Sequence, residues 1–191
     1  AAVQMTSGPE VAANLAAADR LVAEAADAGA AVVVLPENFA IMGLREADKL
    51  SASEPDGSGP IQDATAALAA RRGVWIVAGT IPLKVIGEPR VAAASVVFDA
   101  AGSRVARYDK IHLFAFDNGT EHYDESRVLE PGNAPVCFSL PSVDGHTWRV
   151  GLSVCYDLRF AALYQALQAD VLLVPSAFTH TTGQAHWEVL L

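Results

Sequence analysis

The sequence predicts an α/β fold with a mixed sheet, because short apolar runs alternate with helical patterns along most of the chain. Residues 31–35 read Ala-Val-Val-Val-Leu, a β-branched run typical of a strand that is covered on both faces. In residues 12–28, before this run, apolar side chains recur near one helical face, and Gly29 is a natural helix end. A second helix and strand follow residue 60, and such regular alternation excludes an all-α or an all-β class.

The later elements continue this order. Residues 61–72 are expected to form a helix that ends at Gly73, and residues 74–79 a second buried strand. Two apolar segments joined around Ala101 and Gly102 are expected to pair as a hairpin. The remaining expected elements are strands at 92–99, 104–108, 149–154 and 170–174, helices at 161–168 and from 184, and loop-rich stretches at 51–60 and 113–135.

A chain of 191 residues has the size of one domain with a large core, so residues 1–191 are expected to form a single domain. The opening residues 1–5 read as the middle of an apolar strand without an initiating Met, and residues 186–191 stop within a helical pattern. We therefore expect the chain to be truncated at both ends. The last helix, which carries Trp187 and Val189, is expected to pack against a further segment or a second subunit.

Charge and composition exclude several classes of partner. The formal net charge is −9, and no run of Lys or Arg could form a basic patch, so a nucleic acid would be repelled. No stretch approaches the roughly 20 apolar residues that span a bilayer. The two cysteines, Cys137 and Cys155, form no CxxC pair, and the histidines lack metal-ligand spacing. We expect a cytoplasmic protein without a disulfide framework, a metal or another cofactor.

Three potentially reactive side chains each follow an apolar run. Glu37 comes two residues after the strand that ends at Leu35, Lys110 follows the strand 104–108, and Cys155 directly follows Val154. Ligands of open α/β sheets bind beyond the carboxyl ends of the strands, so these groups are placed where a site is expected. Each has a structural alternative when taken alone: an inert buried thiol, a helix-capping carboxylate and a solvated lysine.

Together the three groups suit amide hydrolysis through a thiol. A base must remove the thiol proton, because the thiolate is the nucleophile. A donor must stabilise the oxyanion of the tetrahedral intermediate, and an acid must protonate the departing nitrogen. A carboxylate, an ammonium and a thiol that share one pocket meet these requirements.

Three motifs carry a family resemblance. Residues 35–39 (LPENF), 108–114 (YDKIHLF) and 151–160 (GLSVCYDLRF) together resemble the nitrilase superfamily of carbon–nitrogen hydrolases, in its order and at similar spacing. The resemblance extends over essentially the whole chain. It implies an α-β-β-α sandwich and a homodimer or larger homo-oligomer.

The resemblance also implies residue roles. Glu37 would be the base, Lys110 an oxyanion donor and Cys155 the nucleophile that forms a thioester. A second glutamate is expected after the lysine motif, and Glu125 stands at that place, although a solvated loop carboxylate is an equal interpretation. The backbone N–H of Tyr156 would be the second oxyanion donor.

The C-terminal motifs are similar to one branch of the superfamily. Residues 176–178 (SAF) and 182–188 resemble the branch that contains omega-amidase and deaminated glutathione amidase, and Phe178 is placed at the substrate. This implies hydrolysis of the terminal amide of a small dicarboxylic-acid monoamide, with release of ammonia and a carboxylate. Many relatives have Pro-Glu after the Arg-Phe of the cysteine motif, where this chain has Ala161-Ala162, so the role of Arg159 stays open.

Three alternatives remain. The chain could act on another amide, a carbamoyl compound or a nitrile. It could be a cysteine hydrolase of another type, with a histidine as base. A catalytically silent relative used for assembly would be expected to have lost at least one of the three reactive residues, and none is lost here.

Overall fold

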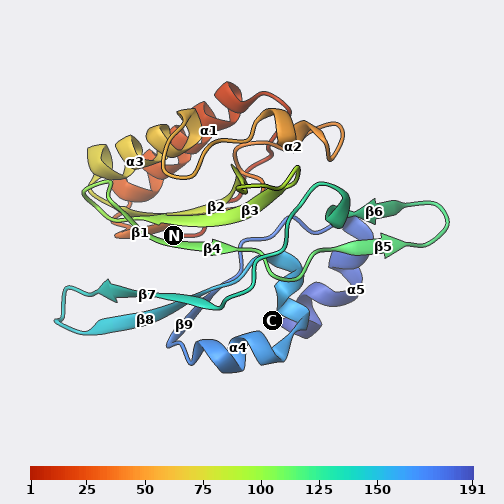
Figure 1. The fold of residues 1–191 in the computed structure, drawn as a ribbon. Helices are drawn as coiled ribbons and strands as arrows, with labels where there is room; N and C mark the ends of the chain where they lie inside the picture. The colour runs from red at the N-terminus through yellow and green to blue at the C-terminus, as the bar shows by residue number, and fades with distance from the viewer.

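The computed structural model describes all residues 1–191. The chain forms four layers: a pair of helices, a first sheet, a second sheet and a further helix (Figure 1). Helices α1 (Val11–Asp27) and α3 (Pro60–Arg72) lie on the outer face of the first sheet. The first sheet has the order β1 (Val32–Leu35), β2 (Trp75–Lys84), β3 (Val91–Phe98) and β4 (Arg104–Asp109). The second sheet has the order β7 (Val136–Pro141), β8 (Thr147–Leu152) and β9 (Val171–Leu173), with α4 (Ala161–Leu167) below it.

The first sheet is mixed, as the sequence predicts. Strands β1 and β2 are parallel, whereas β2, β3 and β4 pair antiparallel. Every residue of β3 is buried, which accounts for its apolar composition, interrupted only by Ser95. Helix α3 begins with Pro60 in its first turn and ends at Gly73, whose left-handed backbone closes the helix.

The space between the sheets is filled by a second apolar core. Val77, Val97 and Tyr108 from the first sheet meet Phe138 and Leu152 from the second, and all five are buried. The α-β-β-α sandwich implied by the family resemblance is therefore confirmed. None of the helices is long and apolar enough to cross a membrane.

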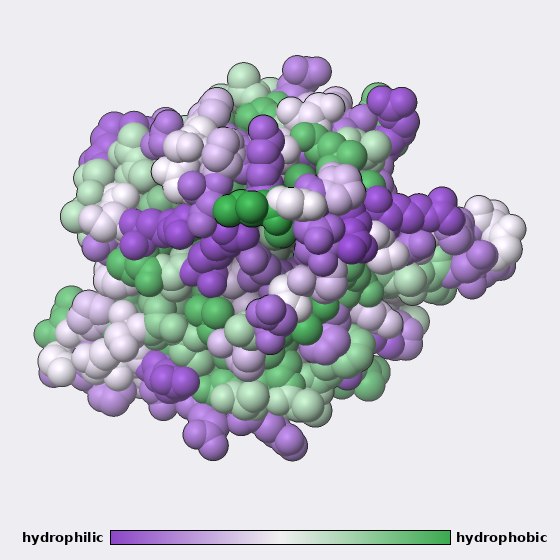
Figure 2. Space-filling model, in the orientation of Figure 1, coloured by the Kyte–Doolittle hydropathy of each residue, from purple (hydrophilic) through white to green (hydrophobic).

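Several short elements differ from the sequence-based expectation. The stretch 113–135, expected to be loop, contains the projecting hairpin of β5 (Ala115–Asp117) and β6 (His122–Asp124), along which Figure 2 shows hydrophilic side chains. A short helix α2 (Asp48–Ser51) precedes α3. Strands of three residues and a helix of one turn are too short to produce a recognisable hydrophobic period.

Both ends of the chain also differ in detail. Residues 1–5, expected to be a strand, form only a single bridge between Ala2 and Val34 at the outer edge of β1. The last helix, α5 (His180–Leu190), begins four residues earlier than expected, because the Thr179 hydroxyl accepts a hydrogen bond from the Thr182 N–H and caps it. The packing of α5 against further protein stays a prediction.

A bulge in β2 brings the strand against the segment that leads to Glu37. The strand was expected to end at Gly79, but its pairing with β3 shifts register between Ala78 and Ile81 and continues to Lys84. At Gly79 the φ angle is +20°, and a Cβ would stand 1.8 Å from the Pro36 carbonyl oxygen. Only glycine fits without moving that segment.

We predict that Gly79→Ala lowers the free energy of unfolding by about 1–3 kcal/mol or more, because the added methyl must displace the backbone before Glu37. Gly87→Ala is the matched control, since Gly87 has a φ of +81° but no atom within 4 Å of an added Cβ. Urea unfolding would give both values. Equal losses in the two variants would contradict the close approach at Gly79.

Candidate active site

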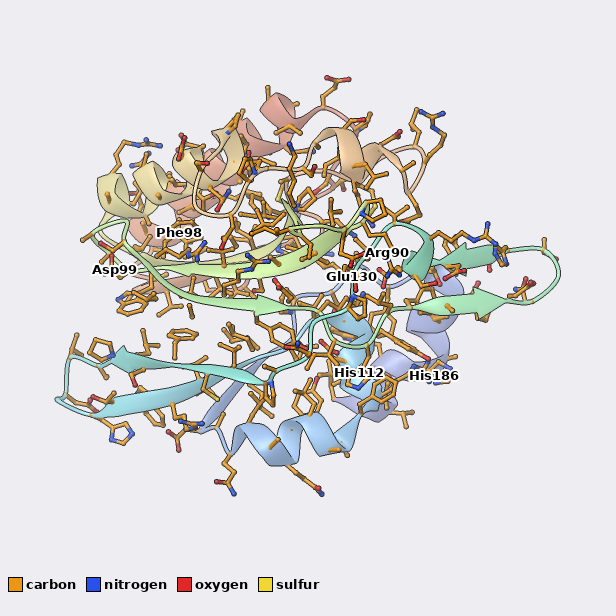
Figure 3. The ribbon with its side chains drawn as sticks, viewed as in Figure 1. Arg90, Phe98, Asp99, His112, Glu130 and His186 are labelled. Carbon is orange, nitrogen blue, oxygen red and sulfur yellow. The ribbon has the colours of Figure 1, made fainter.

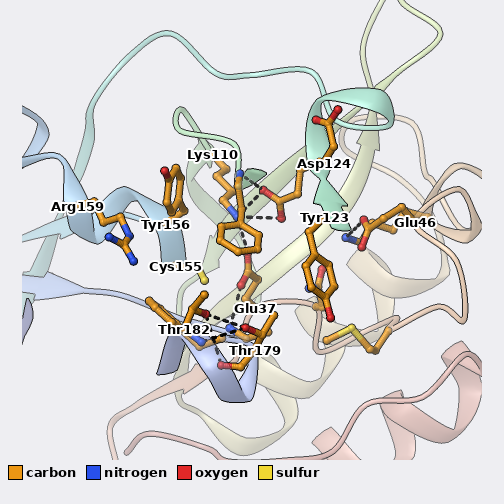
Figure 4. Close-up of a pocket in the computed structure, with 17 residues that line it drawn as sticks. Glu37, Glu46, Lys110, Tyr123, Asp124, Cys155, Tyr156, Arg159, Thr179 and Thr182 are labelled. Atoms are coloured by element: carbon orange, nitrogen blue, oxygen red, sulfur yellow. Dashed lines mark hydrogen bonds and ion pairs between the residues drawn. The ribbon is translucent and has the colours of Figure 1, made fainter. Parts of the chain in front are cut away.

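A cavity of about 250 Å³ opens where the carboxyl ends of the strands meet the β5–β6 hairpin and the start of α5. Figure 4 shows Glu37, Lys110 and Cys155 at its centre. Tyr156 and Arg159 lie on one side, and Tyr123 and Glu46 on the other. The 17 lining residues are Glu37, Asn38, Met42, Glu46, Lys49, Lys110, Phe114, Tyr123, Asp124, Glu125, Cys155, Tyr156, Arg159, Ala177, Phe178, Thr179 and Thr182.

Glu37 is held by the turn that follows β1. Asn38 adopts a left-handed φ of 58°, and its N–H donates to the Thr80 hydroxyl at 2.8 Å. The Glu37 carboxylate is buried and accepts two hydrogen bonds. One comes from the Lys110 ammonium at 2.8 Å, and the other from the backbone N–H of Ala177 at 2.8 Å.

Lys110 enters the cavity at the end of β4. Its backbone N–H donates to the Ala93 carbonyl, and its side chain is 1% exposed. The ammonium also lies 2.8 Å from the carboxylate of Glu125, which in addition accepts a hydrogen bond from the Phe114 N–H at 2.7 Å. Lys110 therefore stands between the buried carboxylate of Glu37 and the largely buried carboxylate of Glu125.

Cys155 begins the short 3-10 turn Cys155–Arg159 after β8. Its φ of 47° is left-handed, an uncommon conformation for a residue other than glycine. Its N–H donates to the Pro175 carbonyl at 3.0 Å, which holds the turn against the segment after β9. The residue is 7% exposed and its thiol faces the cavity beside Glu37.

Burial and charge pairing have opposite effects on the pKa values of these groups. Burial, the largest single effect, would raise the pKa of Glu37, but the charge and hydrogen bond of Lys110 and a hydrogen bond from Cys155 together hold that pKa below its usual range. Burial disfavours the charged form of Lys110 as well, yet the carboxylates of Glu37 and Glu125 raise its pKa well above the ordinary value. Burial raises the pKa of Glu125, and the Glu37 charge acts in the same direction.

The nucleophile candidate is also affected. Burial first, and then the Glu37 carboxylate, raise the pKa of the Cys155 thiol well above its usual range, while the charge of Lys110 acts the other way. At neutral pH the site thus holds an ammonium and a carboxylate that face a neutral thiol. Such an arrangement can remove the thiol proton when the sulfur attacks a carbonyl and can stabilise the oxyanion that results.

The structure brings all six sequence-predicted residues to one cavity, since Glu125, Tyr156 and Phe178 line it with the three central residues. Cys137 lies elsewhere, in β7, with its thiol directed to the Leu167 carbonyl. No group of three His, Cys, Asp or Glu side chains is arranged to hold a metal ion.

Other contributors to the site have no signal in the sequence. The Ala177 N–H that holds Glu37 is a backbone group, so residue type carries no signal for it. Lys49 is buried in the cavity wall and pairs with Glu46 at 2.7 Å, in a stretch without recognisable periodicity.

Comparisons with known proteins all point to one family. The model of the carbon-nitrogen hydrolase family matches residues 1–191. A deaminated glutathione amidase of Yersinia enterocolitica is 38% identical over an alignment that covers 100% of this chain and 66% of that protein. The chloroplastic omega-amidase of Arabidopsis thaliana is 36% identical, over 93% of this chain and 48% of that protein.

Solved structures agree with these relatives. The C. elegans NitFhit protein aligns with a TM-score of 0.82 at 31% identity and covers 100% of this chain and 46% of that one. Saccharomyces cerevisiae Nit3, a member of branch 10 of the nitrilase superfamily, aligns with a TM-score of 0.80 at 26% identity, over 96% of this chain and 65% of that one. The chain thus spans 66% of the length of the bacterial relative and less of some others.

We predict that Lys110→Met destabilises the fold by about 3–5 kcal/mol near neutral pH, because it leaves the buried Glu37 and the largely buried Glu125 without a counter-charge. In the wild type the depressed pKa of Glu37 stabilises the fold above the carboxyl's unfolded pKa, and this contribution is lost as the pH falls through the folded pKa. In the variant the unpaired carboxylates of the folded protein take up protons more readily than in the wild type. The loss in free energy of unfolding, relative to the wild type, should therefore be smaller at acid pH.

Urea unfolding at about pH 7 and about pH 5 tests this prediction. Lys84→Met is the matched control, because Lys84 is exposed at the end of β2. A deficit that is the same at both pH values would contradict the ion-pair account.

Proposed function

The chain belongs to the carbon–nitrogen hydrolase family, and from this premise we propose that it is an amidase that cleaves the C–N bond of a small amide through a Cys155 thioester. One observation carries the proposal. A carboxylate, an ammonium and a thiol, contributed by Glu37, Lys110 and Cys155, meet in one buried cavity. Each of the three residues follows a different strand. A purely structural role for one of them would therefore not explain why all three meet in the same cavity.

The first half of the reaction forms the thioester. As the Cys155 sulfur attacks the amide carbonyl, its proton passes to the Glu37 carboxylate and the carbonyl oxygen becomes an oxyanion. The Lys110 ammonium and the Tyr156 N–H would stabilise that oxyanion. When the C–N bond breaks, Glu37 returns the proton to the nitrogen, ammonia departs and the acyl group remains on sulfur.

The second half repeats these roles with water. Glu37 takes a proton from water, the oxygen attacks the thioester carbonyl, and the C–S bond breaks. The thiolate recovers its proton from Glu37, and the product leaves as a carboxylic acid that ionises. Glu125 would act indirectly, because it shares the Lys110 ammonium and fixes its position.

The side of the cavity formed by Tyr156 and Arg159 suggests the substrate class. Lys49 and Lys110 are paired with carboxylates, whereas Arg159 forms no ion pair and its buried Nε has no hydrogen-bond partner. Its guanidinium lies 5.6 Å from the centre of the Tyr156 ring. An unpaired guanidinium beside the thiol favours an amide that carries a carboxylate. We propose a dicarboxylic-acid monoamide, which fits the names of the amidase relatives.

Residues 161–162 supply no charge that would pair with Arg159. Ala161 and Ala162 are exposed and carry no carboxylate. The guanidinium therefore has no acidic partner of its own in this turn, and its charge stays available to a ligand.

The rival hydrolase with a histidine base gains no support from the geometry. None of the five histidines lines the cavity. His112, the nearest in sequence to Lys110, directs Nδ1 to Asp157 instead.

Ammonia release by the purified protein on monoamides of dicarboxylic acids, deaminated glutathione, aliphatic amides and nitriles tests the proposed function. We expect Cys155→Ala to abolish release and Cys137→Ala to keep most of it, because only Cys155 faces Glu37 and Lys110. Cys155→Ser should also fail, since a hydroxyl is far harder to deprotonate than a thiol. Full activity of Cys155→Ala would overturn the proposal.

Arg159→Met tests the substrate class. We expect kcat/KM for carboxylate-bearing amides to fall by about 10- to 100-fold, since a hydrogen bond to a charged group contributes about 1.5–3 kcal/mol. Simple aliphatic amides should be nearly unaffected. Arg149→Met is the matched control, because Arg149 contacts the Leu167 carbonyl and does not line the cavity. An equal loss on both kinds of amide would contradict the assignment.

A further inference from the structure

Asp157 is a fully buried carboxylate that the proposed reaction does not use. It is 0% exposed, does not line the cavity, and follows Cys155 by two residues. A buried carboxylate is costly unless several donors satisfy it. Its four hydrogen bonds are from the Val154 N–H at 2.9 Å, the Tyr108 hydroxyl at 2.7 Å, the His112 N–H at 3.0 Å and the His112 Nδ1 at 2.7 Å.

These donors come from two segments that flank the reactive groups. Tyr108 and His112 lie two residues before and two residues after Lys110. Val154 and Asp157 lie on either side of Cys155. One carboxylate thus joins the end of β4, which positions the ammonium, to the turn that positions the thiol.

Further contacts make this link stiff. The Tyr108 hydroxyl also accepts a hydrogen bond from the Ile111 N–H, and Tyr108 itself is fully buried. The His112 ring (Figure 3) lies flat on Phe160, with ring centres 3.6 Å apart and an interplanar angle of 7°. Phe160 ends the 3-10 turn that begins with Cys155, so the ring stack holds the far end of the same turn.

The turn needs such support because of its backbone. The left-handed conformation of Cys155 costs on the order of 1–3 kcal/mol and persists only where surrounding contacts determine it. A reacting group displaced by 1 Å can lose about 10²-fold in rate. The carboxylate fixes both the turn and its distance from Lys110.

We propose that Asp157 is a positioning residue that sets the geometry between the Cys155 thiol and the Lys110 ammonium. The inference rests on the proposed function for its effect on turnover. It assigns to Asp157 an influence on kcat through two neighbours, without contact to the substrate.

Asp157→Asn tests the proposal, because the amide keeps the volume but presents an N–H₂ group to at least one of the present donors. We expect kcat to fall by about 10²-fold while KM changes by less than about twofold. Glu54→Gln is the matched control. Glu54 is also a buried carboxylate, which accepts hydrogen bonds from Ile61 and Gln62 at the start of α3, away from the cavity. It should lose stability but keep its kcat.

A second readout does not require turnover. The rate at which iodoacetamide alkylates Cys155, followed on its peptide by mass spectrometry over a range of pH, reports the surroundings of the thiol. In Asp157→Asn the midpoint of the rise in alkylation rate with pH should move toward the ordinary thiol pKa of about 8.5, because the sulfur leaves its buried place beside Glu37. In Glu54→Gln the midpoint should stay at the wild-type value.

These outcomes separate the two claims. If the wild type releases no ammonia from any amide, the proposed function fails, while a shifted midpoint in Asp157→Asn alone still supports the positioning role. The positioning role would be overturned if the alkylation midpoint and kcat were both unchanged in Asp157→Asn, or if Glu54→Gln changed them equally. If Asp157→Asn does not fold, Tyr108→Phe decides, because it removes only one of the four hydrogen bonds to Asp157: a lower kcat supports the proposal and an unchanged kcat overturns it.

Discussion

The Lys110 ammonium, held between the carboxylates of Glu37 and Glu125, is the interaction on which the rest of the site depends. Glu37 and Lys110 are buried and Glu125 is largely buried, so each carboxylate would be costly without the cation and the cation would be costly without them. The same pairing keeps Glu37 ionised beside a neutral thiol. The proposed base and the proposed oxyanion donor are thereby charged before any substrate arrives, so neither has to be reorganised during the proposed reaction.

Backbone geometry serves this charge arrangement. The bulge at Gly79 lets β2 pass close to Pro36, and the Thr80 hydroxyl then holds the left-handed turn at Asn38 that directs Glu37 inward. On the opposite sheet the left-handed Cys155 directs the thiol toward the same point. Such backbone positions are uncommon for residues other than glycine, and here two of the three lie in the lining of one cavity.

Much of this could be predicted from the sequence, for identifiable reasons. The long elements have clear hydrophobic periods, and Glu37, Lys110 and Cys155 each stand directly after an apolar run. The three-residue strands β5 and β6 have no such period, and the continuation of β2 past Gly79 depends on a register shift with its partner strand. The roles inferred for the Ala177 N–H and Asp157 arise from contacts between distant segments, which neither residue type nor spacing reveals.

The proposed thioester on Cys155 provides the most direct test of the account. Wild-type protein is mixed with a carboxylate-bearing amide, the reaction is quenched with acid during the first turnovers, and the digested protein is analysed by mass spectrometry. The account predicts an acyl adduct on the peptide that contains Cys155, together with release of ammonia and no adduct in Cys155→Ala. An adduct on the peptide that contains Cys137, or turnover that persists in Cys155→Ala, would contradict it.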